Sequence, residues 1–129
     1  MRLIIGGANQ GKLKWYLSQN PSESEEIMDG DSVSLEKIPP QKIFYHFHRW
    51  VFRQVESGKD PMPLLKEYLS DCPDAVIICD EIGCGVVPIQ PIEREWREMT
   101  GRLCCYLAKQ ATCVDRIFCG LSMNLKKEG

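Results

Sequence analysis

Residues 2–17 read RLIIGGANQGKLKWYL, and this stretch decides the fold. It contains an apolar run from Leu3 to Ile5, a glycine-rich turn, Lys12, and then a sequence compatible with a helix. A short apolar run bounded by glycine is typical of a buried parallel strand. Glycines let backbone N–H groups surround a phosphate, and the N-terminus of the next helix adds partial positive charge. We therefore expect a strand, a phosphate-binding loop and a helix, with Lys12 at the phosphate.

The loop matches the pattern G-x-x-x-x-G-K-[ST] at Gly6, Gly11 and Lys12 and departs from it at Leu13. The usual hydroxyl at that position coordinates Mg²⁺ at the phosphates, and leucine has no ligand atom. Either Mg²⁺ is held by water molecules and other acids, or the site binds a phosphate without fast turnover. An ordinary glycine-rich turn is the alternative to a phosphate site. The predicted nucleotide-binding residues are Gly6, Gly7, Ala8, Asn9, Gln10, Gly11, Lys12 and Leu13.

A second apolar run ends in two acids, in the sequence AVIICDE at residues 75–81. A buried strand ending in an acid is the Walker B arrangement, in which an aspartate orders Mg²⁺. Asp80 is the predicted metal ligand, and Asp80 and Glu81 are both candidate catalytic acids beside Lys12. Neighbouring side chains on a strand point in opposite directions. We therefore expect one acid to face the nucleotide and the other the loop backbone.

Apolar strands alternate with helical patterns along the chain. This alternation predicts a single α/β domain over residues 1–129, with a mostly parallel sheet. The expected strands are residues 2–6, 75–80 and 114–120, with a weak strand at 32–38, and the expected helices are 11–18, 41–57, 64–70 and 91–111, followed by a polar tail.

The carboxyl ends of the strands are the expected place of the site. In open α/β sheets the binding crevice lies just beyond these ends. Residues 6–12, residues 80–88 and the stretch after Cys119 would then meet on one rim of the sheet.

Composition excludes several classes of protein. The chain has 129 residues and a formal net charge of −2, which gives no general attraction to nucleic acid or an anionic membrane. No apolar run reaches 18 residues, and the N-terminal apolar run is too short for a signal peptide. Seven cysteines without a secretion signal indicate free thiols and a cytoplasmic location. Cys79 and Cys119 lie in apolar runs and are expected in the core.

His46 and His48 lie in the sequence FYHFHRW, inside the expected helix at 41–57. Two positions apart on a helix, they do not share a face, which argues against a metal clamp between them. Either imidazole is a candidate acceptor for a phosphoryl or nucleotidyl group, and a half-exposed histidine without such a role is the alternative. The aromatic residues of the segment exceed one core stripe and are expected to reach a subunit contact: Phe44, Tyr45, Trp50 and Phe52.

Residues 75–126 resemble the C-terminal part of the adenosylcobinamide kinase/adenosylcobinamide-phosphate guanylyltransferase family of the cobalamin pathway. In that family a strand ending in an acid precedes an E-[VI]-G-x-G-[IV]-V-P loop, which here runs from Glu81 to Pro88. The next helix carries R-x-x-R-[DE]-x-x-G-R and then L-A, matched by Arg94 to Arg102 and by Leu107-Ala108. A strand ending in glycine completes the match at Val114 to Gly120.

The resemblance implies a P-loop α/β domain with a RecA-like sheet, assembled as a homotrimer. It implies phosphorylation of the aminopropanol hydroxyl of adenosylcobinamide, with ATP or GTP as the donor and Mg²⁺ as cofactor. Transfer of GMP through a guanylylated histidine would follow. The implied partners are a nucleotide and a corrinoid, and the loop residues that would line the acceptor pocket are Gly83, Gly85, Val87 and Pro88.

Two departures from the family pattern bear on activity. The sequence IIGGANQGKL is similar to the family's G-G-x-x-S-G-K-S loop, with Gln10 and Leu13 in place of the serines. The family's H-R-x-x-R-P-x-x-W pattern is absent around His46 and His48. We expect a kinase-like phosphotransferase whose guanylyltransferase half lacks its signature. The alternative is a paralogue that binds a nucleotide or a corrinoid in a regulatory or accessory role, without catalysis.

Overall fold

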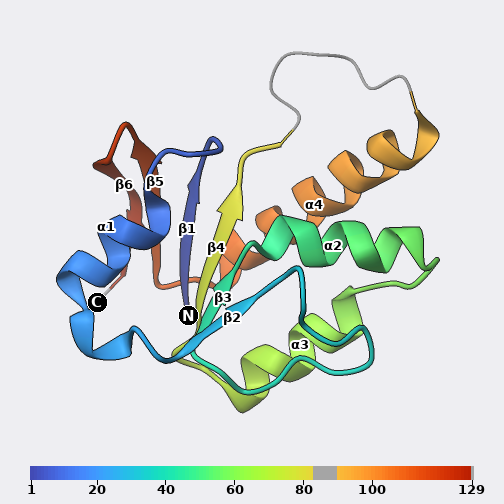
Figure 1. The fold of residues 1–129 in the computed structure, drawn as a ribbon, viewed down its shortest axis with the longest axis horizontal. Coiled ribbons are helices and arrows are strands. Elements are labelled where there is room, and N and C mark those ends of the chain that lie inside the picture. The colour runs from blue at the N-terminus through green and yellow to red at the C-terminus, as the bar shows by residue number, and fades with distance from the viewer. Residues whose placement is uncertain (83–89, 129) are drawn as a thin grey trace.

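The computed structural model describes residues 1–82 and 90–128, and in these ranges it contains a mostly parallel six-stranded sheet. The strand order is β2-β3-β4-β1-β5-β6 (Figure 1). All neighbouring strands are parallel except β6, which is antiparallel to β5. The strands are β1 (Arg2–Gly6), β2 (Ile27–Asp29), β3 (Ile43–Tyr45), β4 (Val76–Asp80), β5 (Cys113–Phe118) and β6 (Leu121–Lys127). The helices are α1 (Lys12–Gln19), α2 (Phe47–Glu56), α3 (Met62–Asp71) and α4 (Pro91–Gln110), with a short 3-10 turn, η1 (Pro21–Glu23).

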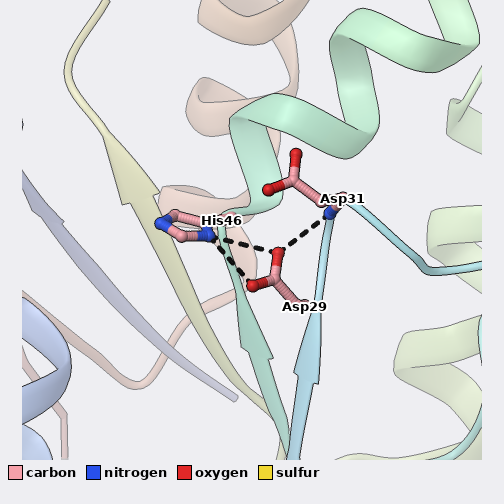
Figure 2. A group of neighbouring side chains, drawn as sticks. All are labelled: Asp29, Asp31 and His46. Atoms are coloured by element: carbon pink, nitrogen blue, oxygen red, sulfur yellow. Dashed lines mark hydrogen bonds and ion pairs between the residues drawn. The ribbon is translucent and has the colours of Figure 1, made fainter.

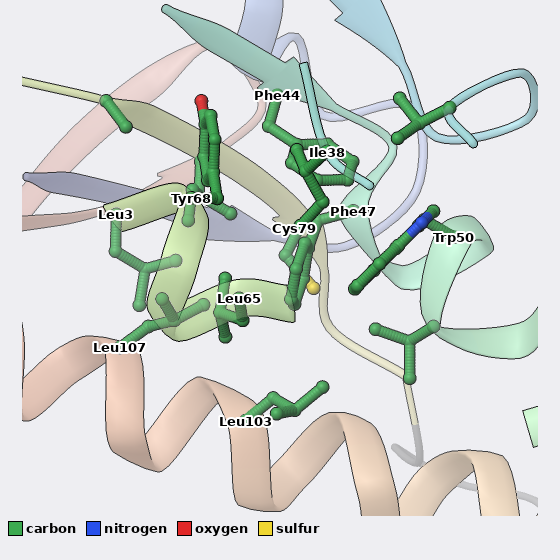
Figure 3. Close-up of a cluster of buried hydrophobic side chains, with 14 of the residues drawn as sticks. Leu3, Ile38, Phe44, Phe47, Trp50, Leu65, Tyr68, Cys79, Leu103 and Leu107 are labelled. Atoms are coloured by element: carbon green, nitrogen blue, oxygen red, sulfur yellow. The ribbon is translucent and has the colours of Figure 1, made fainter. Parts of the chain in front are cut away.

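Helices cover the two faces of the sheet unequally, which gives a three-layer P-loop-like fold (Figure 1). Successive side chains of β1 point to opposite faces. Leu3 joins the large core under α2, α3 and α4, whereas Ile4 joins a smaller cluster with Tyr16 of α1. Figure 3 shows the large core, in which side chains from the three helices meet those of the sheet: Trp50, Leu65, Leu103 and Leu107. The α/β fold predicted from the sequence is confirmed.

The segment at residues 41–57 differs from its prediction as a single helix. Ile43 to Tyr45 form β3, which pairs with both β2 and β4, and α2 begins only after His46. Phe44 and Trp50 are fully buried, so they pack in the chain's own core and do not reach a subunit contact. The spacing of apolar residues in this segment also fits a helix, but pairing of residues 43–45 with the neighbouring strands decides the structure.

Residues 32–38 do not form the predicted weak strand. They wrap across α2, whose side chains bind the loop's backbone carbonyls. Trp50 Nε1 donates to Ser34 O at 3.1 Å, and Gln54 Nε2 donates to Leu35 O at 3.1 Å. These bonds take the place of a strand's ladder, because buried backbone groups need partners.

The C-terminal segment is not the predicted polar tail, because Leu121 to Lys127 form the edge strand β6. The turn that joins it to β5 contains Cys119 in the left-handed region, at φ 51°, and this residue is exposed. The expectation that Cys119 lies in the core is therefore wrong, whereas Cys79 on β4 is buried as expected. None of the helices in the described ranges is both long enough and apolar enough to cross a membrane.

Candidate functional site

The predicted phosphate-binding loop, between β1 and α1, has two residues in the left-handed region. Asn9 and Gly11 have positive φ values of 60° and 84°. Gly11 immediately precedes the helix, and its left-handed conformation favours glycine because no Cβ is present. The unpaired N–H groups of the first turn of α1 consequently face the loop, which is the arrangement that binds anions at helix N-termini.

Lys12 is the first residue of α1 and is 5% exposed. Its Nζ donates to Gly7 O at 2.8 Å and lies 2.6 Å from Asp80 Oδ1. The ammonium group thus bridges the phosphate-binding loop and the carboxyl end of β4. The structure brings together the two charged residues that the sequence placed on separate motifs.

The same loop is bound to the turn between β5 and β6. Gln10 Oε1 accepts a hydrogen bond from Cys119 N at 2.6 Å, and Gln10 O accepts one from Gly120 N at 3.0 Å. In their described parts, all three segments predicted to share a rim are therefore in contact, since Asp80 of the third pairs with Lys12. The third contains the predicted acceptor-loop residues Gly83, Gly85, Val87 and Pro88, which lie outside the described residues.

Leu13 packs its side chain against the small cluster under α1 and also lines the pocket above the loop. It offers no oxygen to a metal. Asp80 is the residue that would hold Mg²⁺, because its carboxylate lies at the loop beside Lys12. One carboxylate fits this ion, since Mg²⁺ usually keeps several waters and takes other ligands from the phosphates.

His48 is buried and contacts Asp80 at the carboxylate oxygen that does not pair with Lys12. The backbone N–H of Asp80 donates to His48 Nδ1 at 3.1 Å, and His48 Nε2 lies 3.4 Å from Asp80 Oδ2. Burial lowers the pKa of His48 to about 4, although Asp80 raises it and the charges of His46, Arg49 and Lys12 lower it further. The ring is therefore neutral, with its Nδ1 lone pair occupied.

Glu81 lies apart from this group. Its carboxylate accepts two hydrogen bonds from Arg116 on β5, Nε to Oε1 at 2.8 Å and Nη2 to Oε2 at 3.0 Å. Asp80 and Glu81 thus point in different directions, Asp80 to the phosphate-binding loop and Glu81 across the end of β1 to the neighbouring strand.

A pocket of about 530 Å³ opens above the phosphate-binding loop. Its lining comes from that loop, from the starts of α1 and α2, and from the ends of β3 and β4, with residues Ala8, Asn9, Gln10, Gly11, Lys12, Leu13, Lys14, Tyr45, His46, Arg49 and Asp80. This volume lies in the range of small-molecule sites. His46 lines the pocket and His48 does not, so the structure separates the two candidate acceptors.

His46 is held by the end of β2. Its Nδ1 lies 3.1 Å and 3.2 Å from the two carboxylate oxygens of Asp29, and its ring stacks on Tyr45 with centroids 3.7 Å apart. Figure 2 shows the second ring nitrogen on the side of the ring away from Asp29. Burial acts to raise the pKa of Asp29, but hydrogen bonds from Asp31 N and His46 and the nearby charges of His46 and Arg49 lower it overall.

Asp29, Asp31 and His46 each place a potential ligand atom within 4.8 Å of the others, and this spacing would suit a cation (Figure 2). All three groups already have protein partners. Arg49 Nη1 lies 2.6 Å from Asp31 Oδ2, and His46 Nδ1 faces Asp29. The arrangement serves better as a hydrogen-bonded support for the histidine than as a metal site.

A family model described as cobinamide kinase / cobinamide phosphate guanyltransferase matches residues 46–125. The match spans more than half of the 129 residues. The chain belongs to this family. The resemblance recognised in residues 75–126 is thereby confirmed, and the matched range begins at His46 and includes Asp80. The phosphate-binding loop lies before it. A comparison with curated proteins found no match.

Members of the cobinamide kinase / cobinamide phosphate guanyltransferase family act on nucleotides and a corrinoid, and this assignment fits the pocket that we describe. Sequence reasoning missed three residues of that pocket and its support, namely Asp29, Tyr45 and Arg49. The acidic segment around Asp29 has the composition of a solvated loop, and a strand of three residues is too short to show a period.

Proposed function

We propose that the chain is an NTP-dependent phosphotransferase that uses ATP or GTP and phosphorylates a hydroxyl group of a corrinoid, adenosylcobinamide. The observation that carries this proposal is the ion pair of buried Lys12 with half-buried Asp80 in the lining of the 530 Å³ pocket. Phosphoryl transfer depends on positioning and on neutralising charge. A loop with free N–H groups, a lysine and an acid at a strand end together supply those requirements.

Mg²⁺ in this site would be held by Asp80, by water and by the nucleotide, and it would neutralise charge on the β- and γ-phosphates. Leu13 removes one protein ligand from that set. We therefore propose a slower kinase than one with a hydroxyl at this position. Lys12 is then the main protein group whose charge neutralises the transferred phosphoryl group.

Nucleotidyl transfer through His46 is a second proposed activity, favoured by a separate observation. The imidazole lines the same pocket as the phosphate-binding loop, and its Nδ1 is engaged by Asp29, which leaves Nε2 for the nucleotide. His48 has its Nδ1 lone pair in a bond from Asp80 N and is 4% exposed. The acceptor in this proposal is His46, and His48 supports Asp80.

The corrinoid would enter from the side of α2 and α4. A pocket of about 430 Å³ lies there, shares Arg49 with the nucleotide pocket, and has Phe52 and Trp96 in its lining. Aromatic faces suit a large apolar ring system, and an arginine suits the phosphate of the first product. Glu81 and the loop at residues 83–88 stay candidates for ordering the acceptor.

Two radioactive labels test the proposal in one assay. The protein is mixed with adenosylcobinamide, Mg²⁺ and GTP or ATP labelled at the γ-phosphate, and in parallel with GTP labelled at the α-phosphate. Label from the γ-position in the corrinoid supports the kinase, and acid-labile α-label on the protein supports the nucleotidyl-histidine. Nucleotide that protects against heat without any transfer would support the binding paralogue instead.

Variants of two neighbouring residues sharpen this assay. We expect Lys12→Ala to reduce γ-label transfer by at least about 100-fold, because it removes the charge at the phosphates. We expect Leu13→Ser to raise the Mg²⁺-dependent rate, with Leu17→Ser as the matched control, since Leu17 packs in the same cluster one turn further along α1. Equal rates in the two serine variants would contradict the role given to position 13.

A further inference from the structure

Nε2 of His46 can act as a nucleophile only if the proton of the imidazole ring is on Nδ1. A neutral imidazole has one donor nitrogen and one acceptor nitrogen, and the hydrogen bond to one of them decides which is which. An ionised carboxylate can only accept. Because Nδ1 of His46 faces both oxygens of Asp29, at 3.1 Å and 3.2 Å, Nδ1 must be the donor, and in the neutral ring Nε2 then holds the lone pair.

The backbone around this pair is built to keep it in place. Asp29 and Tyr45 are register partners at the carboxyl ends of the parallel strands β2 and β3, so the residue after Tyr45 falls beside Asp29. His46 itself has φ 55° and ψ 42°, a left-handed conformation that costs energy in a residue with a side chain. Gly30 N donates to Tyr45 O at 2.8 Å and clamps the turn. Strain of this kind persists where surrounding structure fixes it, and it gathers at functional sites.

Asp29 is also held in its own position. The backbone N–H of Asp31 donates to Asp29 Oδ1 at 2.9 Å (Figure 2). The carboxylate of Asp31 pairs with Arg49, which lines the pocket, and not with the imidazole. The carboxylate of Asp29 is thereby left to the histidine.

We propose that Asp29 is a positioning residue for nucleotidyl transfer, which holds His46 in the Nδ1–H form and presents Nε2 to the nucleotide. The inference rests on the proposed activity of His46. The Nε2 lone pair attacks the α-phosphorus, an N–P bond forms, and the bond from that phosphorus to the bridging oxygen breaks. Pyrophosphate leaves with the bonding electrons. The proton stays on Nδ1, where Asp29 balances the charge of the substituted imidazolium.

The second half of the cycle, transfer of the nucleotidyl group from His46 to the acceptor, uses the same geometry. An oxygen of the phosphorylated acceptor attacks the phosphorus, the N–P bond breaks, and its electrons return to Nε2. No proton has to leave Nδ1 in either step. A carboxylate that keeps the same hydrogen bond throughout would lower both barriers, as orienting carboxylates do for other catalytic histidines.

The test compares Asp29→Asn with Asp31→Asn in the full chain. Nitrogen NMR of the histidine rings reports the tautomer, and α-labelled GTP reports the rate of protein labelling. We expect Nδ1–H at His46 in the wild type, partial or complete loss of that form in Asp29→Asn, and a labelling rate about 100-fold lower. Asp31→Asn, on the same turn, should keep the tautomer and lose no more than a few-fold in rate.

The outcomes separate this inference from the activity on which it rests. Labelling at the wild-type rate in Asp29→Asn, or an Nε2–H form of His46 in the wild type, would overturn the role of Asp29 and leave nucleotidyl transfer standing. A wild type without α-label would overturn nucleotidyl transfer and the inference together. Equal losses in both asparagine variants, with an unchanged tautomer, would reduce Asp29 to a structural residue of the turn.

Discussion

At the scale of single residues, two histidines two positions apart in the chain use Nδ1 in opposite ways. His46 donates from Nδ1 to a carboxylate and leaves Nε2 free, whereas His48 accepts at Nδ1 from Asp80 N. The difference follows from where each lies. His46 lies at the end of a strand, beside another strand's end, and His48 lies inside α2, packed against the end of β4. A histidine's chemistry is thus set by its neighbours across the sheet.

We expect His48 to make the protein less stable as the pH falls from about 6.5 to about 4. The pKa of His48 is lowered from 6.5 to about 4 in the folded protein. Between these values the unfolded chain binds a proton that the folded chain does not, so the free energy of unfolding decreases towards low pH. The loss reaches roughly 3 kcal/mol at the lower end. Above pH 6.5 this residue makes no pH-dependent contribution.

Urea unfolding at pH 7.5, 6.5, 5.5 and 4.5 measures this effect, with His48→Asn as the comparison. The asparagine oxygen can still accept from Asp80 N, but the side chain does not titrate in this range. The carboxylates titrate in both proteins, so the difference between the two curves isolates the histidine. Parallel curves would show that His48 does not titrate with the lowered pKa.

At the scale of elements, the junction of β2 with α2 depends on one close approach. A Cβ at Gly30 would lie 2.0 Å from His46 O and 2.8 Å from His46 C, and both atoms belong to the backbone. We expect Gly30→Ala to lower the free energy of unfolding by roughly 2–4 kcal/mol, because the turn must shift. Thermal unfolding measures it, and α-label transfer should fall with it.

Gly101→Ala is the matched control for this substitution. Gly101 lies inside α4, and a Cβ there would meet no atom within 4 Å. Replacing a helical glycine with alanine should raise stability by up to about 1 kcal/mol. A Gly30→Ala protein that is as stable as the wild type would mean that the strand end and the histidine are not held against each other.

The same elements show what sequence reasoning can reach. The strand, loop and helix at residues 2–19 are encoded by a local pattern, because the apolar run, the glycines and the lysine each indicate one structural role. The strand and the helix lie where the sequence predicted them. The start of α2 did not, since Ile43 and Phe44 satisfy a helical spacing and a buried strand equally well. Only pairing with β2 and β4, which depends on residues far along the chain, decides between them.

The residues of the candidate site likewise fall into those that a local motif predicts and those that only the folded sheet brings together. Lys12 and Asp80 belong to local motifs and could be placed on one rim from the order of strands alone. Asp29 could not, because its partner is 17 residues away and the strand that carries it has three residues. A contact between two strand ends is a property of the folded sheet, and no short pattern encodes it.

At the scale of the whole molecule, one edge of the sheet exposes a row of apolar side chains. Phe118 of β5 and the alternate residues of β6 are 52–73% exposed, and the row consists of Phe118, Leu121, Met123 and Leu125. Phe118 pairs with Leu121, and Arg116 pairs with Met123, so these side chains share one face of the hairpin. β6 is also the last strand of the sheet (Figure 1). Natural sheets seldom leave such an edge open to water.

We expect a second copy of the chain to cover this row, in keeping with the homotrimer that the family resemblance implies. Replacing both Leu121 and Met123 by lysine should dissociate the assembly to monomers in sedimentation velocity, because two charges would be buried in the contact without partners. Folding should be unaffected, since both side chains are exposed in the single chain. Ser122→Lys, one position along on the opposite face of β6, is the matched control and should keep the assembly. A monomeric wild type at all concentrations, or a double variant that still assembles, would place the contact elsewhere.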